Sequence, residues 1–394
     1  MNILVVNCGS SSLKFQLVDS ETEQVKASGN CERIGLDGKI VYKSGGKKTE
    51  TKSSLPDHAV AISKVLDMLT DLNDGVISSL DEIHAIGHRL VHGGEKFSSS
   101  VVIDEDIIKE IETCNDLAPL HNPANILGIR ACQRAMPRIK HVAVFDTAFH
   151  QTMPAKAYLY GLPKEYYSKY GVRRYGFHGT SHSFVSKRLA ELAGLDYENS
   201  KLIICHIGSG ASIAAVKNGK SIDTSMGMTP LEGLVMGTRS GDIDPAIIEF
   251  ICQKENISVS EMTMVLNKKS GMFGLSGVSN DCRDIIEASK NGDEDATNAL
   301  DVLAYRIIKY IGAYYMALGG ADAIALTAGA GENSSEIRKS IMDGLSAIGV
   351  EMNEEANKTR GEEVLLSTPS SKVPVWIVPT NEELAIARET ARLV

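Results

Sequence analysis

The chain has 394 residues, enough for two domains of ordinary size, and its hydrophobic share of 43% with 23% charged residues is that of a soluble globular protein. The formal net charge of -9 argues against a nucleic-acid partner, because such proteins usually present a basic surface. No run of 18 apolar residues and no basic-then-apolar leader occurs, so we expect a cytoplasmic protein without a membrane span. Seven scattered cysteines without a C-x-x-C pair predict reduced thiols rather than disulfides or a zinc ribbon.

The first predicted element is a β-hairpin within residues 3–17. Apolar residues 3–6 are followed by NCGSSS, and apolar residues then return on alternate positions from Leu13 to Leu17. Glycine and serine tolerate the tight backbone of a hairpin turn. The same residues, with Lys14, also suit a cradle of amides, hydroxyls and one cation around a phosphate. On this stretch alone both interpretations stay open.

Strand and helix patterns then alternate to the end of the chain. Apolar runs at 140–145, 201–207 and 322–327 predict strands, and amphipathic stretches at 181–193 and 296–318 predict helices. This alternation indicates an α/β fold. No linker of biased composition appears, so we expect a packed hinge near residue 150, after the strand that ends at Phe145.

An internal repeat links the two halves. Placing Asn7 on His206 also places Gly9 on Gly208 and Ser10 on Ser209, so a strand, a small-residue turn and a return strand occur twice. The second hairpin continues into Asn218-Gly219, a strong signal for a further tight turn. Three matching positions can arise by chance, but two like hairpins predict a duplicated fold that holds a polyphosphate in a cleft from two sides.

A third glycine-rich turn, TAGAGEN at 327–333, is predicted to lead from a strand into a helix at Ser334, as phosphate and nucleotide sites often do. None of the three segments is a Walker loop. In the second hairpin, the one that comes nearest to that motif, Ala214 stands where the first glycine of the motif must be. The absence of G-x-G-x-x-G counts against a Rossmann dehydrogenase.

Polar clusters outside the hairpins carry the residues suited to chemistry. They are GHRLVHGGEKF at 87–97, PLHNP at 119–123 with VFDTAFHQTMP at 144–154, and RRYGFHGTSH at 173–182 followed by a long glycine-rich stretch at 223–245. A long stretch without periodicity is usually functional or disordered, and its Met and Leu content speaks against disorder. Each polar residue also has a structural alternative: Arg89 as a surface ion pair, His121 and His178 as hydrogen-bonded loop histidines, and Asp146 as a turn cap.

Two further spacings have ordinary explanations. Glu382 and Glu383 follow Asn381 as acids in the first turn of a capped helix, where the helix dipole favours them, and for Glu383 we expect that role. His178 and His182 have the spacing of zinc-peptidase histidines. The glutamate that must follow the first histidine is replaced by Gly179, so a zinc hydrolase is not expected.

Taken together, the motifs resemble those of the acetate kinase family, in order and from residue 2 to the C-terminus. The segments that carry the resemblance are VNCGSSSLKF, GHRLVHGGEKF, LAPLHNPAN, AVFDTAFHQTMP, RRYGFHGTSH, DTSMGMTPLEGLVMGTRSGDIDP, TAGAGEN and PTNEELAIARET. The resemblance implies duplicated ribonuclease-H-like domains, as in actin, sugar kinases and heat-shock ATPases, flanking an ATP cleft. The expected N-terminal domain is 1–150 plus 385–394 with the first phosphate hairpin, and the expected nucleotide-binding domain is 151–384.

The resemblance also implies the activity: reversible, direct in-line transfer of the ATP γ-phosphoryl group to acetate, giving acetyl phosphate and ADP. It implies a homodimer, ATP or ADP as nucleotide, and Mg²⁺, or Mn²⁺ in its place. Catalytic roles fall to Arg89, Asp146, Arg239, His178 and His121, with Asp146 steering the metal and Arg239 rather than abstracting a proton.

The family's binding residues map onto four further sets. The acetate site comprises Arg89, Val91, Leu120, Phe177 and Pro230. The phosphate hairpins comprise Ser10, Ser12 and Lys14, and His206, Gly208, Ser209 and Gly210. The adenosine site comprises Asp281, Cys282, Arg283, Gly329, Ala330, Gly331 and Ile337. The metal site comprises Asn7 and Glu382.

Two alternative functions stay open, and the sequence departs from the family's pattern at one residue. A kinase of propionate or butyrate in the same family differs only by methylenes, each worth about 1 to 3 kcal/mol in discrimination. An actin-like or heat-shock-like ATPase would turn over ATP without acetate. The family's second hairpin typically reads H-x-G-N-G, whereas this chain has HIGSG, so Ser209 replaces an amide that could reach a phosphate oxygen.

Overall fold

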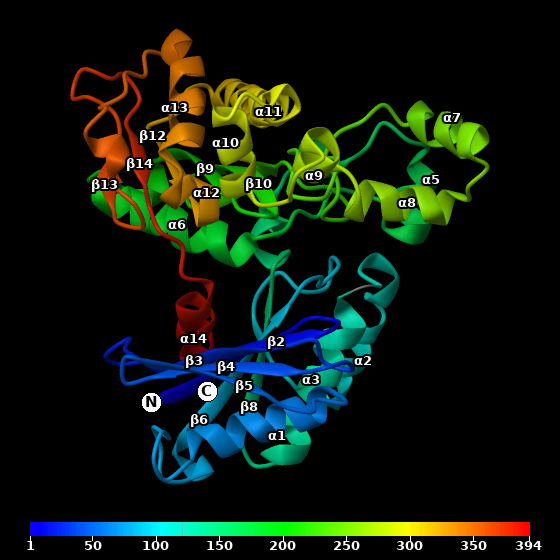
Figure 1. The fold of residues 1–394 in the computed structure, drawn as a ribbon, viewed down its shortest axis with the longest axis vertical. Coiled ribbons are helices and arrows are strands. Elements are labelled where there is room, and N and C mark those ends of the chain that lie inside the picture. The colour runs from blue at the N-terminus through cyan, green and yellow to red at the C-terminus, as the bar shows by residue number, and fades with distance from the viewer. Residues whose placement is uncertain (120) are drawn as a thin grey trace. The chain divides into compact units, whose positions relative to one another are not determined.

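The computed structural model describes residues 1–119 and 121–394, which form two compact units (Figure 1). Unit 1 comprises Met1–Phe149 and Asn381–Val394, and unit 2 comprises His150–Thr380. The predicted functional division into domains 1–150 plus 385–394 and 151–384 stays a prediction.

Unit 1 is built on an eight-stranded sheet in the order β5-β4-β3-β2-β1-β6-β8-β7. Strands β1 to β5 form an antiparallel meander, whereas β6 and β8 run parallel to β1. The strands are β1 Asn2–Cys8, β2 Ser12–Asp19, β3 Val25–Glu32, β4 Lys39–Ser44, β5 Lys47–Lys52, β6 Ile83–Leu90, β7 Val101–Val102 and β8 Lys140–Phe145.

The two faces of this sheet bury different cores because side chains alternate along β1. Leu4 and Val6 pack with helices α1 and α3, whereas Ile3 and Val5 pack with α14, which Figure 1 shows on the other side of the strands. The helices of unit 1 are α1 His58–Leu69, α2 Glu105–Glu112, α3 Asn122–Ala135 and α14 Glu382–Leu393. The C-terminal helix therefore completes a core that begins at the N-terminus.

Unit 2 repeats the central part of this topology. Its sheet has the order β11-β10-β9-β12-β14-β13, with an antiparallel β9–β10–β11 meander and with β12 and β14 parallel to β9. Thus β11-β10-β9-β12-β14 corresponds to β3-β2-β1-β6-β8. The strands are β9 Lys201–Ile207, β10 Ala211–Lys217, β11 Lys220–Thr224, β12 Ala323–Thr327, β13 Val364–Leu365 and β14 Val375–Ile377.

Helices cover both faces of the second sheet as well. Helix α6 packs on β9 and β12, and α11 packs on β9 and β10, on opposite sides of the strands in Figure 1. The helices are α4 Ala155–Tyr158, α5 Lys164–Tyr170, α6 Gly179–Leu192, α7 Ala246–Glu255, α8 Val259–Lys268, α9 Gly271–Ser276, α10 Cys282–Lys290, α11 Glu294–Leu318, α12 Ala328–Asn333 and α13 Ser335–Gly344. Single-turn 3₁₀ helices lie at Leu80–Glu82, Asn115–Leu117, Ala148–Thr152, Tyr197–Asn199, Ser346–Ile348 and Ala356–Lys358.

Most predicted elements are confirmed. The strands, the long helices and the two hairpins occur where the patterns place them, and Asn218 and Gly219 form their turn with φ of 53° and 73°. One prediction was wrong: residues 328–333 of TAGAGEN are a short helix rather than an open turn. Glu332 explains the difference, since its carboxylate accepts hydrogen bonds from the Ala328 amide at 2.6 Å and the Thr327 hydroxyl at 3.2 Å, closing the turn.

Among the described residues, no helix combines the length and apolar character needed to cross a membrane. All seven cysteines are free thiols.

Candidate active site

The first hairpin turn is shaped by Gly9. Its amide donates to the Ser12 carbonyl at 2.8 Å, and its own carbonyl lies 2.7 Å from a ring nitrogen of His58. A Cβ at Gly9 would lie 2.8 Å from the Ser12 hydroxyl, so a side chain there would displace that serine. Ser10 is exposed and Ser12 half-buried, which leaves hydroxyls at the tip of the turn.

Lys14 lies directly across the hairpin from Asn7. Both residues line a small cavity together with Arg89 and Glu382, all within unit 1. The predicted metal residues Asn7 and Glu382 therefore lie on one cavity, beside two of the predicted cations. Amide and carboxylate oxygens are donors that Mg²⁺ accepts.

Arg89 and Asp146 form a bidentate ion pair. Arg89 is the second-last residue of β6 and Asp146 follows β8, the parallel neighbour, so the strand ends bring them together. The Arg89 Nε and Nη2 atoms donate to the two carboxylate oxygens at 2.9 and 2.8 Å. This fork matches a planar guanidinium to a planar carboxylate and fixes the orientation of the arginine.

Charge in this cluster is balanced locally. Burial by itself would lower the pKa of Arg89. The carboxylates of Asp146 and Glu382 have the larger effect, so the pKa of Arg89 is raised. Burial also raises the pKa of Asp146, while Arg89 acts in the opposite direction. Glu382 opens α14 behind the N-cap Asn381, as predicted, and its carboxylate lies 3.8 Å from the Arg89 Nε.

Two buried asparagines that the sequence analysis did not select hold the neighbouring loop. Asn125 of α3 donates to the Cys8 carbonyl at 2.6 Å and accepts from the Val91 amide at 3.2 Å, which ties the first hairpin to the end of β6. Asn122 accepts from the His92 amide at 3.1 Å. Their i, i+3 spacing in HNPAN was the signal that could have revealed them. His121, the N-cap of α3, is exposed, and the predicted Leu120 lies outside the described residues.

In unit 2, the second hairpin brings Arg239 and His178 to one glycine. A Cβ at Gly210 would lie 2.8 Å from Arg239 Nη2 and 3.4 Å from His178 Nε2. The turn itself is closed by the Gly208 amide, which donates to the Gly210 carbonyl at 3.1 Å. A side chain at 210 would thus collide with Arg239 and contact His178, the two groups best suited to bind an anion.

Arg239 has no carboxylate partner among the residues that the structure describes. Its Nη1 donates to the Pro230 carbonyl at 2.6 Å, which holds the loop but does not neutralise the charge. Burial lowers its pKa, yet a guanidinium keeps its proton in a protein. A buried cation without a counter-ion favours an incoming anion.

His178 and His206 stack beside the hairpin with ring centroids 4.1 Å apart. His178 is the N-cap of α6 and adopts the left-handed backbone region with φ of 55°, a conformation that marks functional sites in many proteins. The Ser181 hydroxyl lies 2.8 Å from His206 Nδ1 and 2.8 Å from the Thr380 hydroxyl. Phe177, predicted for the acetate pocket, is buried.

Asn280, which precedes the predicted adenosine residue Asp281, and Ser209 of the second hairpin both lie close to Gly237. A Cβ at Gly237 would lie 3.2 Å from the Asn280 carbonyl and 3.3 Å from that of Ser209. Asp281 caps α10, and Arg283 bound to its carboxylate lowers the Asp281 pKa to about 2. In α12, Gly329 faces open space, whereas Gly331 is buried. Of the other residues in the predicted adenosine set, Cys282 and Ala330 are half-buried and Ile337 is buried.

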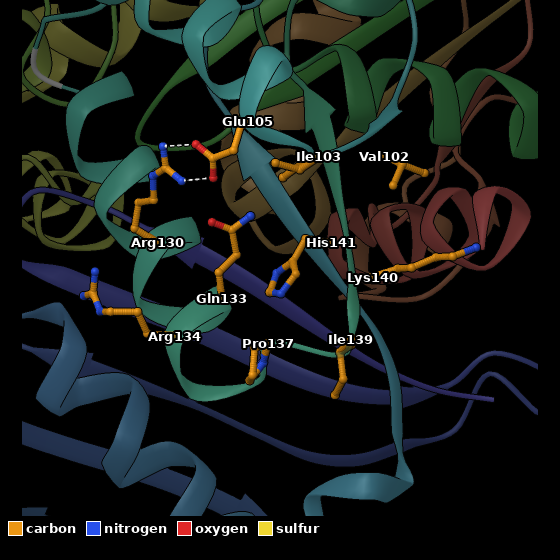
Figure 2. A pocket seen from close by; sticks show the side chains of 10 residues that line it. All are labelled: Val102, Ile103, Glu105, Arg130, Gln133, Arg134, Pro137, Ile139, Lys140 and His141. Atoms are coloured by element: carbon orange, nitrogen blue, oxygen red, sulfur yellow. Dashed lines mark hydrogen bonds and ion pairs between the residues drawn. The ribbon is translucent and has the colours of Figure 1, made fainter.

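A larger cavity of unit 1, about 510 Å³, lies elsewhere (Figure 2). It lies beside Lys140, the first residue of β8, whereas Asp146 lies beyond the opposite end of that strand. Figure 2 shows the ion pair of Arg130 and Glu105 on its rim. It holds none of the predicted site residues, and sites of parallel sheets form at the carboxyl ends of strands.

Comparison with known proteins decides the family. The acetokinase family model matches residues 2–388. The chain belongs to the acetokinase family. It is 61% identical over 395 residues to the acetate kinase of Lachnoclostridium phytofermentans, covering 100% of both chains. The crystal structure of Porphyromonas gingivalis acetate kinase matches at TM-score 0.96 and 48% identity, covering 100% of this chain and 99% of the other.

A second acyl kinase is also similar. A propionate kinase from Francisella tularensis matches at TM-score 0.94 and 42% identity over 100% of both chains. The acetokinase match confirms the predicted family and the predicted α/β fold with its repeated topology. The matched range includes every predicted site residue of this acetokinase, from Asn7 to Glu382.

Proposed function

We propose that this phosphotransferase of the acetokinase family transfers the γ-phosphoryl group of ATP to acetate, reversibly, giving acetyl phosphate and ADP. The observation that carries the proposal is full-length identity of 61% to a protein named acetate kinase. Residues of both units take part in the reaction, and each unit supplies a distinct set of charges.

The acceptor needs no general base. Acetate has a pKa near that of a glutamate side chain, about 4.3, so it is ionised at neutral pH. The barrier to be lowered is the approach of one anion to another, and positive charge and positioning achieve this. Asp146, bound to Arg89, therefore orients a cation and accepts no proton in the reaction.

Arginines are assigned to the two anions. Arg89, fixed by Asp146, orients the acetate carboxylate, and the residues that the family resemblance assigns to the methyl group are Val91, Leu120, Phe177 and Pro230. Arg239, a half-buried cation without a carboxylate partner among the described residues, stabilises charge on the transferring phosphoryl group during in-line displacement. His178 Nε2, which faces the same glycine, donates to a phosphoryl oxygen. His121 adds a further donor.

The nucleotide and metal sites complete the assignment. The two glycine hairpins bind the phosphates through backbone amides and, in the first, Ser10, Ser12 and Lys14, while residues 281–283, 329–331 and 337 bind adenosine. Asn7 and Glu382 fit Mg²⁺, because both present oxygen donors to one cavity. Mg²⁺, when bound, neutralises phosphate charge, and two protein ligands leave room for the water that it retains.

A cytoplasmic homodimer is part of the proposal. Unit 2 exposes large apolar side chains on α5, α7 and α8, helices that Figure 1 shows together in one lobe. Tyr170, Phe250 and Val259 are 66%, 58% and 65% exposed. Exposed apolar surface of this kind favours a protein interface, and a second copy of the chain is the occupant that the family resemblance implies.

Trapping of acyl phosphate with hydroxylamine tests the function. We expect hydroxamate from ATP and acetate, none without acetate, and ATP formation from acetyl phosphate and ADP. ATP hydrolysis that continues without acetate and yields no acyl phosphate would contradict the proposal and favour a binding ATPase.

The likeness to a propionate kinase supports a second candidate, a propionate-preferring enzyme. Comparing kcat/KM for acetate, propionate and butyrate separates the two. We expect acetate to be preferred by about tenfold or more, since one methylene is worth about 1 to 3 kcal/mol.

A further inference from the structure

Ser212 bridges two histidines inside unit 2. Its hydroxyl oxygen lies 2.9 Å from His178 Nδ1 and 2.7 Å from His182 Nε2, and its side chain is fully buried. It lies on β10 directly across from His206 of β9, so the sheet fixes its position. A hydroxyl has one proton, so Ser212 can donate to only one of the two rings and must accept from the other.

His182 decides which ring receives the proton. It is fully buried, and burial, with His150 and His206 nearby, holds its pKa well below the usual range, so the ring is neutral. Its Nδ1 is buried and has no hydrogen-bond partner among the described residues. A buried N–H without an acceptor is rarer in proteins than an unsatisfied acceptor. The His182 proton therefore resides on Nε2, from which it is donated to Ser212.

The remaining directions follow from this choice. Ser212 accepts from His182, and among the described residues the acceptor left for its own buried proton is His178 Nδ1, so the proton is donated there. With Nδ1 acting as an acceptor, the ring proton of neutral His178 must lie on Nε2. That nitrogen lies beside Gly210 and Arg239.

We propose that Ser212, with His182 behind it, is a positioning residue that fixes the proton of His178 on Nε2. The inference rests on the proposed function, in which His178 donates to the transferred phosphoryl group. Its consequence is that His178 always presents an N–H and never a lone pair to that anion. The His182–Ser212 relay also opposes a second proton on His178. A protonated Nδ1 would have to donate to Ser212, which would leave the Ser212 proton without an acceptor or move the His182 proton to its buried Nδ1.

The proton positions can be measured without turnover. In the full chain labelled with ¹⁵N-histidine, ¹⁵N–¹H correlation spectra distinguish Nδ1–H, Nε2–H and imidazolium rings, and a His178→Gln variant assigns the signal. We expect His178 to be Nε2–H alone from pH 8 down to pH 6. In Ser212→Ala, the imidazolium should appear near pH 6.5, the ordinary range, or the Nδ1–H form should accompany it.

Ser212→Thr is the matched control, because it keeps the hydroxyl and should restore the wild-type spectrum. Arg239, His206 and His182 face the ring in all three proteins, so their charges cancel in the comparison. In turnover, Ser212→Ala should lower kcat about tenfold with KM for ATP within twofold, and Ser212→Thr should recover it.

A wild-type His178 with its proton on Nδ1, or an imidazolium at pH 7, would overturn the inference. So would a Ser212→Ala protein whose ring spectrum or kcat equals that of the wild type. If the protein forms no acyl phosphate, the proposed function fails, and the spectra of the wild type alone still decide where the proton lies.

Discussion

The two hairpins share one topology and differ in the charges around them. In the first, the residue across from Asn7 is Lys14, and the nearby Arg89 is neutralised by Asp146 and Glu382. In the second, the residue across from His206 is Ser212. Around that hairpin lie histidine rings and hydroxyls, together with the cation Arg239.

This difference separates two tasks. A cation locked by carboxylates, like Arg89, is oriented but has little net attraction for an anion. Arg239, a half-buried cation without a carboxylate partner in the part of the chain that the structure describes, retains its attraction at the cost of its own desolvation. The first unit therefore suits orientation of an acceptor, and the second suits stabilisation of charge that develops during transfer.

Asp146→Asn should break the comparison most strongly. The change leaves the half-buried Arg89 guanidinium without the buried carboxylate that it binds, and breaking such a pair should lower the free energy of unfolding by about 3 kcal/mol. Urea denaturation measures the loss. The control is Glu23→Gln, which breaks the exposed pair with Arg388 in the same unit and should cost less than about 1 kcal/mol. Equal losses would show that burial of the Arg89 pair has no special weight.

Arg239→Ala is the corresponding test in the second unit. The substitution leaves no carboxylate without its partner, so the free energy of unfolding should change little. We expect kcat to fall about a hundredfold or more, with KM for ATP nearly unchanged. Steady-state kinetics and thermal unfolding measure both effects. An increase in KM with kcat preserved would make Arg239 a binding residue only.

Two buried histidines of unit 1 should make the free energy of unfolding depend on pH. Burial and His141 hold the pKa of His88 well below its usual range, and burial lowers that of His141 to about 4, with their ring nitrogens 2.9 Å apart. The unfolded chain binds these protons near pH 6.5, so stability is full above that pH and is lost as pH falls toward 4.

The expected slope is about 1 kcal/mol per pH unit for each such histidine. Urea denaturation at pH 7 and pH 5 should therefore show a smaller loss in His141→Gln than in the wild type. A wild-type slope retained in His141→Gln would contradict the assignment to this pair.

Ser209→Asn is expected to give the smallest effect. Ser209 is exposed at the tip of the second hairpin, and its carbonyl is already held by the Gly237 amide at 2.9 Å, so the backbone should tolerate asparagine. A longer amide reaching a phosphate oxygen should improve kcat/KM for ATP by about three- to tenfold, or about 0.7 to 1.4 kcal/mol. A tenfold loss would show that this hairpin is built around serine.

Local patterns predicted much of the fold, and tertiary contacts account for what they missed. Alternating apolar residues and Asn218-Gly219 located the hairpins, since these signals act over a few residues. The α12 helix was missed because its closure depends on Glu332, which also accepts from the distant Thr380 amide. Arg89 and Asp146 are 57 positions apart in the sequence. Local motifs could therefore identify each residue as a candidate, but they could not predict that the two form an ion pair.

The role of Ser212 was invisible for a similar reason. Its signal is a buried hydroxyl between two rings, and sequence shows only one serine within an apolar strand. Motif resemblance selected His178 without showing what holds its proton.

The return of α14 to the first sheet has a consequence for synthesis. Ile386 and Ala387 cover Ile3 and Val5, so one face of the first sheet lacks its partner until residues 382–393 have followed unit 2. At ribosomal rates of about 5–20 residues per second, the intervening unit takes on the order of 10 to 50 s to appear. The N-terminal half is thus begun first and completed last, and a chain that terminates before Asn381 carries an open apolar face that invites aggregation.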